Sequence, residues 1–463
     1  MIELLSVHFP SRTLLLVASE AVLTFGALVG ASYIRFQRDT PIVLLYQRNG
    51  WTLLLTVLVC MLSMHYFDLY DSGTLRNRAD AITRLVQSIG TVSLVLASLF
   101  YLFPEIEIDR TLLLLGITSI GIVLAAWRIL FGALQQHSPL TERVLFLGDG
   151  PLLPALTHEC SERPEFGLTP AGYANASRTT SQLPAQIPFL GFTGELPALI
   201  ENENIQRIVL TMADRRGRLP VMELLKLKAR GVRVDDGAAL YEAMTGRIAL
   251  DALHPSWLLF SPGFHLSPAL KTYKRLASIL GAIVGLLMTL PLMLLAAITI
   301  RLDSPGPVIF RQRRVGYGGR VFTCLKFRTM RHHADTGERP TPAAENDARI
   351  TRVGRILRRF RIDELPQLIN ILRGDMHFVG PRPFPPTLES EYAAQIPFYE
   401  QRWNVTPGAS GWAQIHKGYC ASTEDNAEKL AYDLFYIRHL SPGLDLVILF
   451  ETVKILLLGR GAR

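Results

Sequence analysis

Apolar residues gather in four long runs in the first third of the chain. The runs cover residues 12–34, 51–67, 88–104 and 111–134. The first and the last reach the roughly 20 residues that a helix needs to cross a bilayer, and few charges interrupt any of the runs. We therefore expect a transmembrane bundle of four helices over residues 1–135. A buried helical bundle in a soluble protein is the alternative.

Basic residues in the short loops give the bundle an orientation, because cytoplasmic loops are enriched in Lys and Arg. Loop 68–87 carries three arginines and loop 104–110 is acidic. This difference places loop 68–87 and everything after residue 134 in the cytoplasm. Loop 35–50 also carries three arginines and argues against this topology. The first apolar run is long and is not followed by a small-residue cleavage site, so we do not expect a cleavable signal.

Short strand-like segments replace the long apolar runs after Arg143. Strands are expected at Val144–Leu147, Ala171–Ala174, Arg207–Thr211 and Val232–Val234, with a helix at Leu219–Ala229. Strands that alternate with helices predict a parallel α/β domain of the Rossmann-like kind over residues 142–245.

A Gly-Asp-Gly turn at residues 148–150 invites a dinucleotide-binding interpretation of this domain. Leu153 replaces the third glycine of that fingerprint, and no acidic residue ends a clear second strand. We therefore favour a degenerate domain used for packing or regulation over one that binds a cofactor. The domain also offers a surface for a homodimer.

The uncharged run Leu276–Ile300 is long enough to span the membrane, but two features oppose a simple span. Pro291 lies inside the run, where it removes a backbone hydrogen bond and kinks a helix. Both flanks are basic, so a spanning helix would leave one basic flank outside. A re-entrant helix that enters one leaflet, bends at Pro291 and returns keeps both flanks inside. The pattern leaves both paths open.

The last part of the chain mixes strand and helix patterns. After a linker at residues 246–270, we expect a monotopic α+β domain over residues 271–463 that carries the apolar helix 276–300. The C-terminal run Leu444–Leu458 contains three charged residues and predicts an amphipathic helix on the membrane surface.

Arginines crowd the segment that precedes two adjacent carboxylates. They stand at positions 349, 352, 355, 358, 359 and 361, and Asp363 and Glu364 follow. Arginine binds phosphate oxygens bidentately, and carboxylates hold divalent metals or attack phosphorus. Pro366 suits the first turn of a helix, whose N-terminus favours anions. The segment predicts a site for phosphate-bearing substrates; a solvated charged surface is the alternative.

Composition agrees with a membrane protein that handles anions. Of the 463 residues 49% are hydrophobic, the mean hydropathy is +0.23 and the net charge is +8. This balance fits anionic lipid headgroups or anionic substrates better than nucleic acid. The four cysteines (60, 160, 324 and 420) have no paired spacing, so we expect neither a disulfide framework nor a zinc site, and the bulk of the protein in a reducing compartment.

Several blocks resemble a known family. They read KRLASILGAIVGLLMTLPLMLLAAITIRLDSPGPVIFRQRRVGYGGRVFTCLKFRTM, RIDELPQLINILRGDMHFVGPRP, PGASGWAQI and AYDLFYIRHLS, and together cover about residues 271–460. The chain is similar there to the large monotopic phosphoglycosyl transferases, bacterial enzymes that load a sugar phosphate onto polyprenyl phosphate. The leading spans and the α/β domain look like the family's large form. Segment 251–264 looks like the subgroup associated with exosortase-type exopolysaccharide clusters.

The resemblance implies a reaction and roles for particular residues. Asp363 would attack the β-phosphorus of a UDP-sugar and expel UMP, and polyprenyl (undecaprenyl) phosphate would then take the sugar phosphate from Asp363. Glu364 would hold Mg²⁺. Asp433 is a candidate to contact a ligand of the metal without binding the metal itself. The candidate phosphate-binding residues are Arg358, Arg382, Arg402, Lys326 and Arg328. The implied location is the bacterial inner membrane, with the catalytic domain on its cytoplasmic face.

Two positions depart from the family pattern. Leu290 replaces the serine that usually precedes the helix-breaking proline, so another group, such as Thr289, must stabilise the bend. Thr406 replaces a basic residue, and neighbouring Arg402 is a candidate to compensate. Neither position touches the carboxylate pair, so we still expect activity.

Two other functions remain open on the sequence. A membrane-tethered nucleotide-sugar dehydratase using NAD would need a complete glycine fingerprint and a Tyr-x-x-x-Lys pair, and a non-catalytic export scaffold would not need Asp363. The sequence does not identify the sugar or the oligomeric state.

Overall fold

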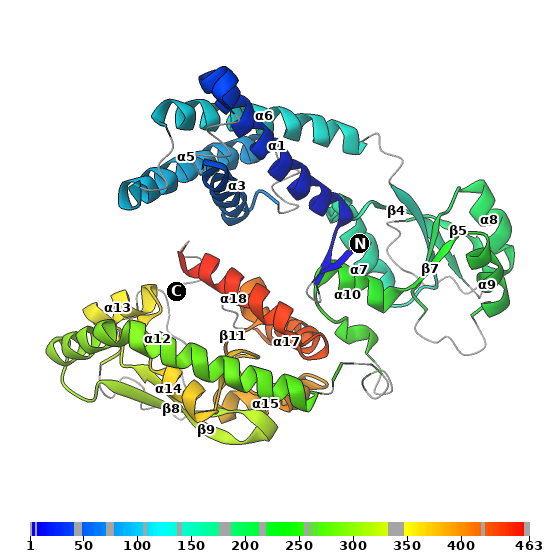
Figure 1. The fold of residues 1–463 in the computed structure, drawn as a ribbon. Coiled ribbons are helices and arrows are strands. Elements are labelled where there is room, and N and C mark those ends of the chain that lie inside the picture. Colours follow the sequence, from blue (N-terminus) through cyan, green and yellow to red (C-terminus); the bar gives the residue numbers. More distant parts are fainter. Residues whose placement is uncertain are drawn as a thin grey trace. The chain divides into compact units, whose positions relative to one another are not determined.

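A computed structural model describes most of the chain (Figure 1). The described residues are 2–4, 7–40, 49–70, 78–104, 109–136, 141–175, 187–212, 219–253, 258, 261, 263–264, 266–331, 347–417 and 422–457. The chain divides into two compact units, which comprise mainly His8–Gly237 and Ala238–Arg463. The domain boundaries expected at residues 135, 245 and 270 stay predictions.

Long apolar helices form the first part of the first unit. They are α1 (Ser11–Phe36), α3 (Asn49–Tyr66), α5 (Arg78–Leu102) and α6 (Arg110–Gln136). Each covers one of the apolar runs, and α1, α5 and α6 are long and apolar enough to cross a membrane. Their facing sides share a core that includes Leu28, Leu53, Leu96 and Leu124. The expected helical part of the fold is confirmed.

A buried ion pair joins α1 to α6. Glu20 is fully enclosed, and its Oε1 lies 2.8 Å from Nε of Arg128. The Arg128 guanidinium also donates to the carbonyl oxygen of Leu69 at 2.9 Å. Because an unpaired charge in apolar surroundings is costly, this contact favours one register of the two helices.

A parallel sheet completes the first unit. Its strands are β3 (Glu142–Leu147), β4 (Leu168–Asn175), β5 (Phe189–Phe192), β6 (Arg207–Leu210) and β7 (Arg233–Asp236). They pair in the order β5-β4-β3-β6-β7, all parallel, which is the strand order of a Rossmann-like sheet. Helices α7 (Leu152–Glu162), α8 (Leu196–Asn202) and α9 (Val221–Ala229) follow strands of this sheet. The predicted Rossmann-like domain is confirmed. At the chain's start, β1 (Ile2–Leu4) and β2 (Val7–Phe9) form a separate two-stranded sheet.

The second unit is built around the long helix α12 (Pro268–Asp303), drawn in green in Figure 1. The Ser267 side chain caps its N-terminus by accepting from the Leu270 N–H. Apolar side chains on one face are exposed, as expected of a helix that meets lipid: Leu276, Leu280, Leu287, Leu294 and Ile298. The opposite face packs on the rest of the unit at both ends, where Arg275 donates to the Ile371 carbonyl and Ile300 packs beside Leu357. The helix continues through Pro291, and its re-entrant path stays a prediction.

Mixed elements pack against α12. Strands β8 (Ile309–Val315) and β9 (Val321–Phe327) form an antiparallel hairpin, and β10 (His377–Val379) and β11 (Gly408–Ser410) a parallel pair. The helices are α13 (Arg352–Arg359), α14 (Gln367–Arg373), α15 (Pro386–Gln395), α16 (Trp412–His416), α17 (Thr423–Arg438) and α18 (Pro442–Leu457). The core lies around α17, whose Leu430, Leu434 and Tyr436 are buried. The expected α+β domain is confirmed.

The start of the second unit is tied to this core. Helix α10 (Gly237–Thr245) carries Glu242, which pairs with Arg438 and with His439 at the end of α17. The Trp412 indole N–H donates to the Gly246 carbonyl at 2.7 Å. Residues that directly follow the parallel sheet therefore pack with the C-terminal core.

Candidate active site

The carboxylate pair lies in a tight turn between two helices. Helix α13 is capped by Thr351, which accepts from the Gly354 N–H. After the helix ends, Arg361 adopts the left-handed conformation (φ 55°) that glycine usually takes at this place. The 3₁₀ turn η7 (Ile362–Glu364) follows and presents both carboxylates. The sequence expectation that Asp363 and Glu364 precede a helix agrees with this geometry, since α14 begins at Gln367.

Glu364 is held by cations from three segments. Its Oε1 lies 2.8 Å from the Lys326 ammonium, 2.9 Å from the Arg382 guanidinium and 3.9 Å from that of Arg361. Burial alone would raise the pKa of Glu364, but Arg382, Lys326 and Arg361 together outweigh burial and hold this pKa well below its ordinary value. Glu364 is therefore a fixed negative charge.

Asp363 has a different environment. Among the described residues, no hydrogen-bond partner contacts its carboxylate. Burial raises the pKa of Asp363 above its ordinary value and the charge of Glu364 adds to this effect, while Lys326, Arg358 and Arg361 oppose it. A partly desolvated carboxylate without hydrogen bonds is available to react, and the surrounding cations suit phosphate oxygens.

The charge of Glu364 affects the pKa values of both Lys326 and Arg382. Burial lowers the pKa of Lys326, and Glu364 opposes this shift. The Glu364 carboxylate raises the pKa of Arg382. The structure thus brings Lys326, Arg358 and Arg382 together at the carboxylate pair, as sequence reasoning expected of residues that share one site.

Arg328 and Arg402 lie elsewhere. Arg328 is 6% exposed and donates to the carbonyl oxygens of Ser304 and Pro305 at 2.7 and 2.8 Å, so it fastens the loop after α12. Arg402 is 5% exposed and donates from Nε to Asp433 at 2.8 Å. The predicted contacts of Arg328 and Arg402 with phosphate, and of Asp433 with a metal's surroundings, stay predictions.

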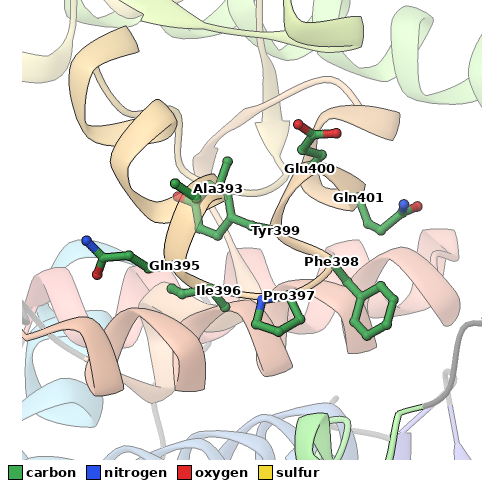
Figure 2. Close-up of a pocket in the computed structure, with 9 residues that line it drawn as sticks. Ala393, Gln395, Ile396, Pro397, Phe398, Tyr399, Glu400 and Gln401 are labelled. Atoms are coloured by element: carbon green, nitrogen blue, oxygen red, sulfur yellow. The ribbon is translucent and has the colours of Figure 1, made fainter.

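A hollow elsewhere on the second unit does not include the carboxylate pair among its lining residues. It lies over the turn from α15 to η8 (Tyr399–Asn404) and is lined by residues 393–401 (Figure 2). None of the predicted site residues lines this hollow, so we assign it no part in phosphate chemistry.

Comparison with known proteins decides the family. The pattern of the bacterial sugar transferase family matches residues 269–459, and that of a CoA-binding domain matches residues 65–226. A UDP-glucose:undecaprenyl-phosphate glucose-1-phosphate transferase of Xanthomonas campestris is 31% identical over 348 residues, which cover 74% of this chain and 72% of that protein. The chain belongs to the bacterial sugar transferase family.

Other relatives agree with this membership. A UDP-N-acetylgalactosamine-undecaprenyl-phosphate N-acetylgalactosaminephosphotransferase of Aeromonas hydrophila is 44% identical over 223 residues, or 48% of this chain. That match spans 52% of the Aeromonas protein, about half its length. A UDP-glucose:undecaprenyl-phosphate glucose-1-phosphate transferase of Caulobacter vibrioides is 45% identical over 186 residues, which cover 40% of this chain and 69% of that protein. The resemblance to the large transferases is confirmed, while the exosortase-associated subgroup stays a prediction.

The α/β domain of this sugar transferase would hold CoA or a dinucleotide at the carboxyl ends of its strands, where such ligands bind in open parallel sheets. Leu153, at the position of the fingerprint's third glycine, is 3% exposed. A Cβ on Gly148 would lie 2.3 Å from Cγ of Met212, so Met212 closes over the glycine turn. The Thr211 hydroxyl donates to the Gly148 carbonyl at 2.6 Å. The described residues at this edge pack closely around Gly148, and the expectation that the domain is degenerate and binds no cofactor stays a prediction.

Arg314 is a site residue that sequence reasoning missed. It is coupled electrostatically to Arg382 and Glu364, and it donates to the Pro383 carbonyl at 2.7 Å. Burial lowers its pKa. The alternation along β8 was an available signal, because Arg311 and Arg313 face outward and Arg314 therefore faces inward.

The two departures from the family pattern have structural settings. Leu290 is 49% exposed on the apolar face of α12, and the Thr289 hydroxyl donates to the Gly285 carbonyl one turn back at 2.6 Å. Thr406 lies beside Pro407, whose carbonyl accepts from the His377 N–H at 2.9 Å. The Arg402 guanidinium contacts protein groups on each of its nitrogens, including the Arg382 carbonyl at 2.9 Å.

Proposed function

We propose that this sugar transferase moves a sugar 1-phosphate from a UDP-sugar to undecaprenyl phosphate, releases UMP and thereby starts the assembly of a lipid-linked exopolysaccharide. The activities named for the Xanthomonas, Caulobacter and Aeromonas relatives support this reaction. The observation that carries the proposal is the unequal pair: Glu364 is held by Lys326 and Arg382, while Asp363 is free to react.

The first half-reaction consumes the donor. A carboxylate oxygen of Asp363 attacks the β-phosphorus, the bond from this phosphorus to the oxygen shared with the α-phosphate breaks, and UMP leaves with that oxygen. The sugar phosphate stays on Asp363 as an acyl phosphate. Lys326, Arg358 and Arg382 bind the phosphate oxygens, where positive charge stabilises the transition state.

The second half-reaction uses the lipid. A phosphate oxygen of undecaprenyl phosphate attacks the phosphorus of the acyl phosphate, the bond to Asp363 breaks, and the carboxylate is restored. Because the two transfers are separate, the water-soluble donor and the lipid need not be aligned together, and ping-pong kinetics follow. The exposed apolar face of α12 keeps the domain at the membrane, where the lipid phosphate lies.

Mg²⁺ is part of the proposal. The described residues form no cluster of three or more metal-ligating side chains, but Mg²⁺ is commonly held by one or two carboxylates with water and substrate phosphate. Glu364 is the carboxylate that would hold the ion. A bound Mg²⁺ would neutralise diphosphate charge, a task that Lys326 and Arg382 share. Asp433 contacts Arg402 and would act on the metal's surroundings only through it.

We also propose that the chain lies in the bacterial inner membrane with its catalytic domain on the cytoplasmic face. The arginines of loop 68–87 support this orientation. Contact with inner-membrane lipid and pairing of two copies through the α/β domain belong to the same proposal.

The test is UMP release from purified full-length protein in nanodiscs, with a panel of UDP-sugars that includes UDP-glucose and UDP-N-acetylgalactosamine. We expect sustained release from at least one donor only when undecaprenyl phosphate is present, and none from Asp363→Asn. A folded wild-type protein that releases no UMP from any donor would contradict the proposal. Bound NAD together with a keto-sugar product would instead indicate a dehydratase.

A further inference from the structure

Arg382 stands in a proline-rich segment that has few donors of its own. The segment Pro381–Phe384, which we call the strap, places Arg382 between two prolines, and Pro385 follows. Proline has no N–H, so the strap can be fixed mainly through its carbonyl oxygens, with donors from other segments.

Each of the four strap carbonyls has a donor. Backbone N–H groups serve the outer two, from Gly408 to Pro381 and from Val315 to Phe384, each at 3.0 Å. Guanidinium groups serve the inner two: the buried Arg402 donates to the Arg382 carbonyl at 2.9 Å, and the half-buried Arg314 to the Pro383 carbonyl at 2.7 Å. The backbone that directly follows the Arg382 side chain is therefore held by arginines, and the backbone before it by the Gly408 N–H.

Arg402 is in turn fixed by its own partners. Its Nε donates to Asp433 at 2.8 Å, and its Nη1 donates to the Tyr399 hydroxyl at 2.5 Å and contacts Glu389 at 3.4 Å. Its guanidinium also lies 5.1 Å from the centre of the Phe384 ring. Glu389 accepts from the Phe384 N–H at 3.2 Å. Arg402 and Glu389 together therefore bind a carbonyl and an N–H of the strap.

The burial of Arg402 separates it from the substrate. With 5% of the residue exposed and every guanidinium nitrogen in contact with a protein group, its guanidinium is engaged within the protein. A buried charge is a costly way to gain stability, and it is better explained by the geometry that it enforces. The planar guanidinium holds a carboxylate and a carbonyl in one fixed geometry through its fork of donors, and the flexible, compact ammonium of lysine does not reproduce that geometry.

We propose that Arg402 and Arg314 are positioning residues that aim Arg382 at the carboxylate pair, and that Asp433 and Glu389 orient Arg402 for this task. The inference rests on the proposed function, because Arg382 is the group that meets the donor's diphosphate. Arg402, a predicted phosphate ligand, then serves the reaction without touching the substrate. A misplacement of about 1 Å at a catalytic group costs roughly 10²-fold in rate, which sets the size of the expected effect.

A double-mutant cycle tests this dependence in the full chain in nanodiscs. Arg402→Lys should lower kcat/KM for the UDP-sugar by roughly 10²-fold. In the Arg382→Ala background the same change should cost less than about twofold, because the residue that Arg402 positions is gone. An equal loss in both backgrounds would overturn the inference, because Arg402 would then act independently of Arg382.

A control separates positioning from general damage. Arg207 in the α/β domain is also a buried arginine, paired with Glu142 at 2.6 Å and Asp235 at 2.5 Å. Arg207→Lys should lower the melting temperature but leave kcat/KM within about twofold of wild type. If Arg207→Lys lowers kcat/KM as much as Arg402→Lys does, the loss reflects damage to the fold and the inference fails.

Hydrogen–deuterium exchange gives a readout that does not need activity. The Phe384 amide, which donates to Glu389, should exchange faster in Arg402→Lys and in Arg314→Lys than in wild type, while the buried amides of α17 stay protected. Unchanged exchange in the strap would overturn the inference even if the protein proves active. Faster exchange in the strap of these variants, together with a wild-type protein that releases no UMP, would leave the positioning standing and contradict the proposed function alone.

Discussion

Lys326 donates a 2.8 Å hydrogen bond to Oε1 of Glu364 and thereby joins strand β9 to the turn that carries both carboxylates. The Arg382 guanidinium, which follows the turn in the chain, donates to the same oxygen at 2.9 Å. Two cations on one carboxylate oxygen leave the neighbouring Asp363 as the carboxylate without a fixed partner among the described residues. This difference between the two carboxylates is why Asp363 is assigned as the nucleophile and Glu364 as the carboxylate that the cations hold in place.

Removal of Lys326 should affect stability and catalysis in separable ways. Lys326→Met leaves the half-buried Glu364 charge with one fewer partner, which should cost about 1–3 kcal/mol in the free energy of unfolding. Adding Glu364→Gln should recover part of that stability and none of the UMP release. Denaturant unfolding in detergent and donor turnover measure the two effects. A double variant no more stable than Lys326→Met would show that the ion pair is not formed.

Arg361 offers a test of the turn itself. Its left-handed backbone is strained for any residue with a Cβ, by roughly 1–2 kcal/mol. Arg361→Gly and Arg361→Ala both remove the cation beside Glu364, so they should lower transfer equally. The glycine variant should be about 1 kcal/mol more stable than the alanine variant. Equal unfolding free energies for the two variants would contradict the left-handed turn.

Gly354 sets the position of α13 and hence of Arg358. A Cβ at this position would lie 2.1 Å from the Thr329 carbonyl oxygen, so α13 must shift to accept it. We expect Gly354→Ala to cost about 1–3 kcal/mol in stability and to lower UMP release. Gly194→Ala, with nothing within 4 Å of the added Cβ, is the matched control and should leave both unchanged. If Gly354→Ala has the stability and the UMP release of wild type, the close approach of Gly354 to the Thr329 carbonyl is contradicted.

His377 should make stability depend on pH. It contacts the Ser278 hydroxyl through Nδ1 at 2.8 Å, and burial together with Lys274 and Arg275 lowers its pKa from 6.5 to about 4. Because the folded pKa is lowered, the contribution is fully present above pH 6.5 and is lost as pH falls toward about 4. The loss amounts to at most about 3 kcal/mol.

Melting curves between pH 7.5 and roughly pH 4 measure this effect. His377→Gln should flatten the decline that wild type shows below pH 6.5, while the exposed His158→Gln should keep it. A wild-type decline that persists unchanged in His377→Gln would assign the pH dependence to other groups.

The apolar runs and the carboxylate pair could be predicted from the sequence because their signals are local. The run 111–134 contains few charges and became α6, and the arginines before Asp363 lie on a helix with an apolar opposite face. Strand β5 was missed because Phe189–Phe192 is only 4 residues long and contains a glycine, so it has too little alternation to register.

The environment of each arginine could not be predicted. Arg328, Arg358 and Arg402 look alike in sequence, yet Arg328 and Arg402 are buried against carbonyls and Arg358 is partly exposed beside Asp363. Whether a guanidinium meets substrate or backbone depends on chain segments far apart in sequence, such as β8 and the strap. Local pattern carries no information on that pairing.

The most direct test of the account is mass spectrometry of the full-length protein incubated with its UDP-sugar in the absence of undecaprenyl phosphate. We predict one sugar-phosphate adduct per chain, mapped to Asp363, that disappears when undecaprenyl phosphate is added and never forms on Asp363→Asn. An adduct on another residue, or full turnover by Asp363→Asn, would contradict the account.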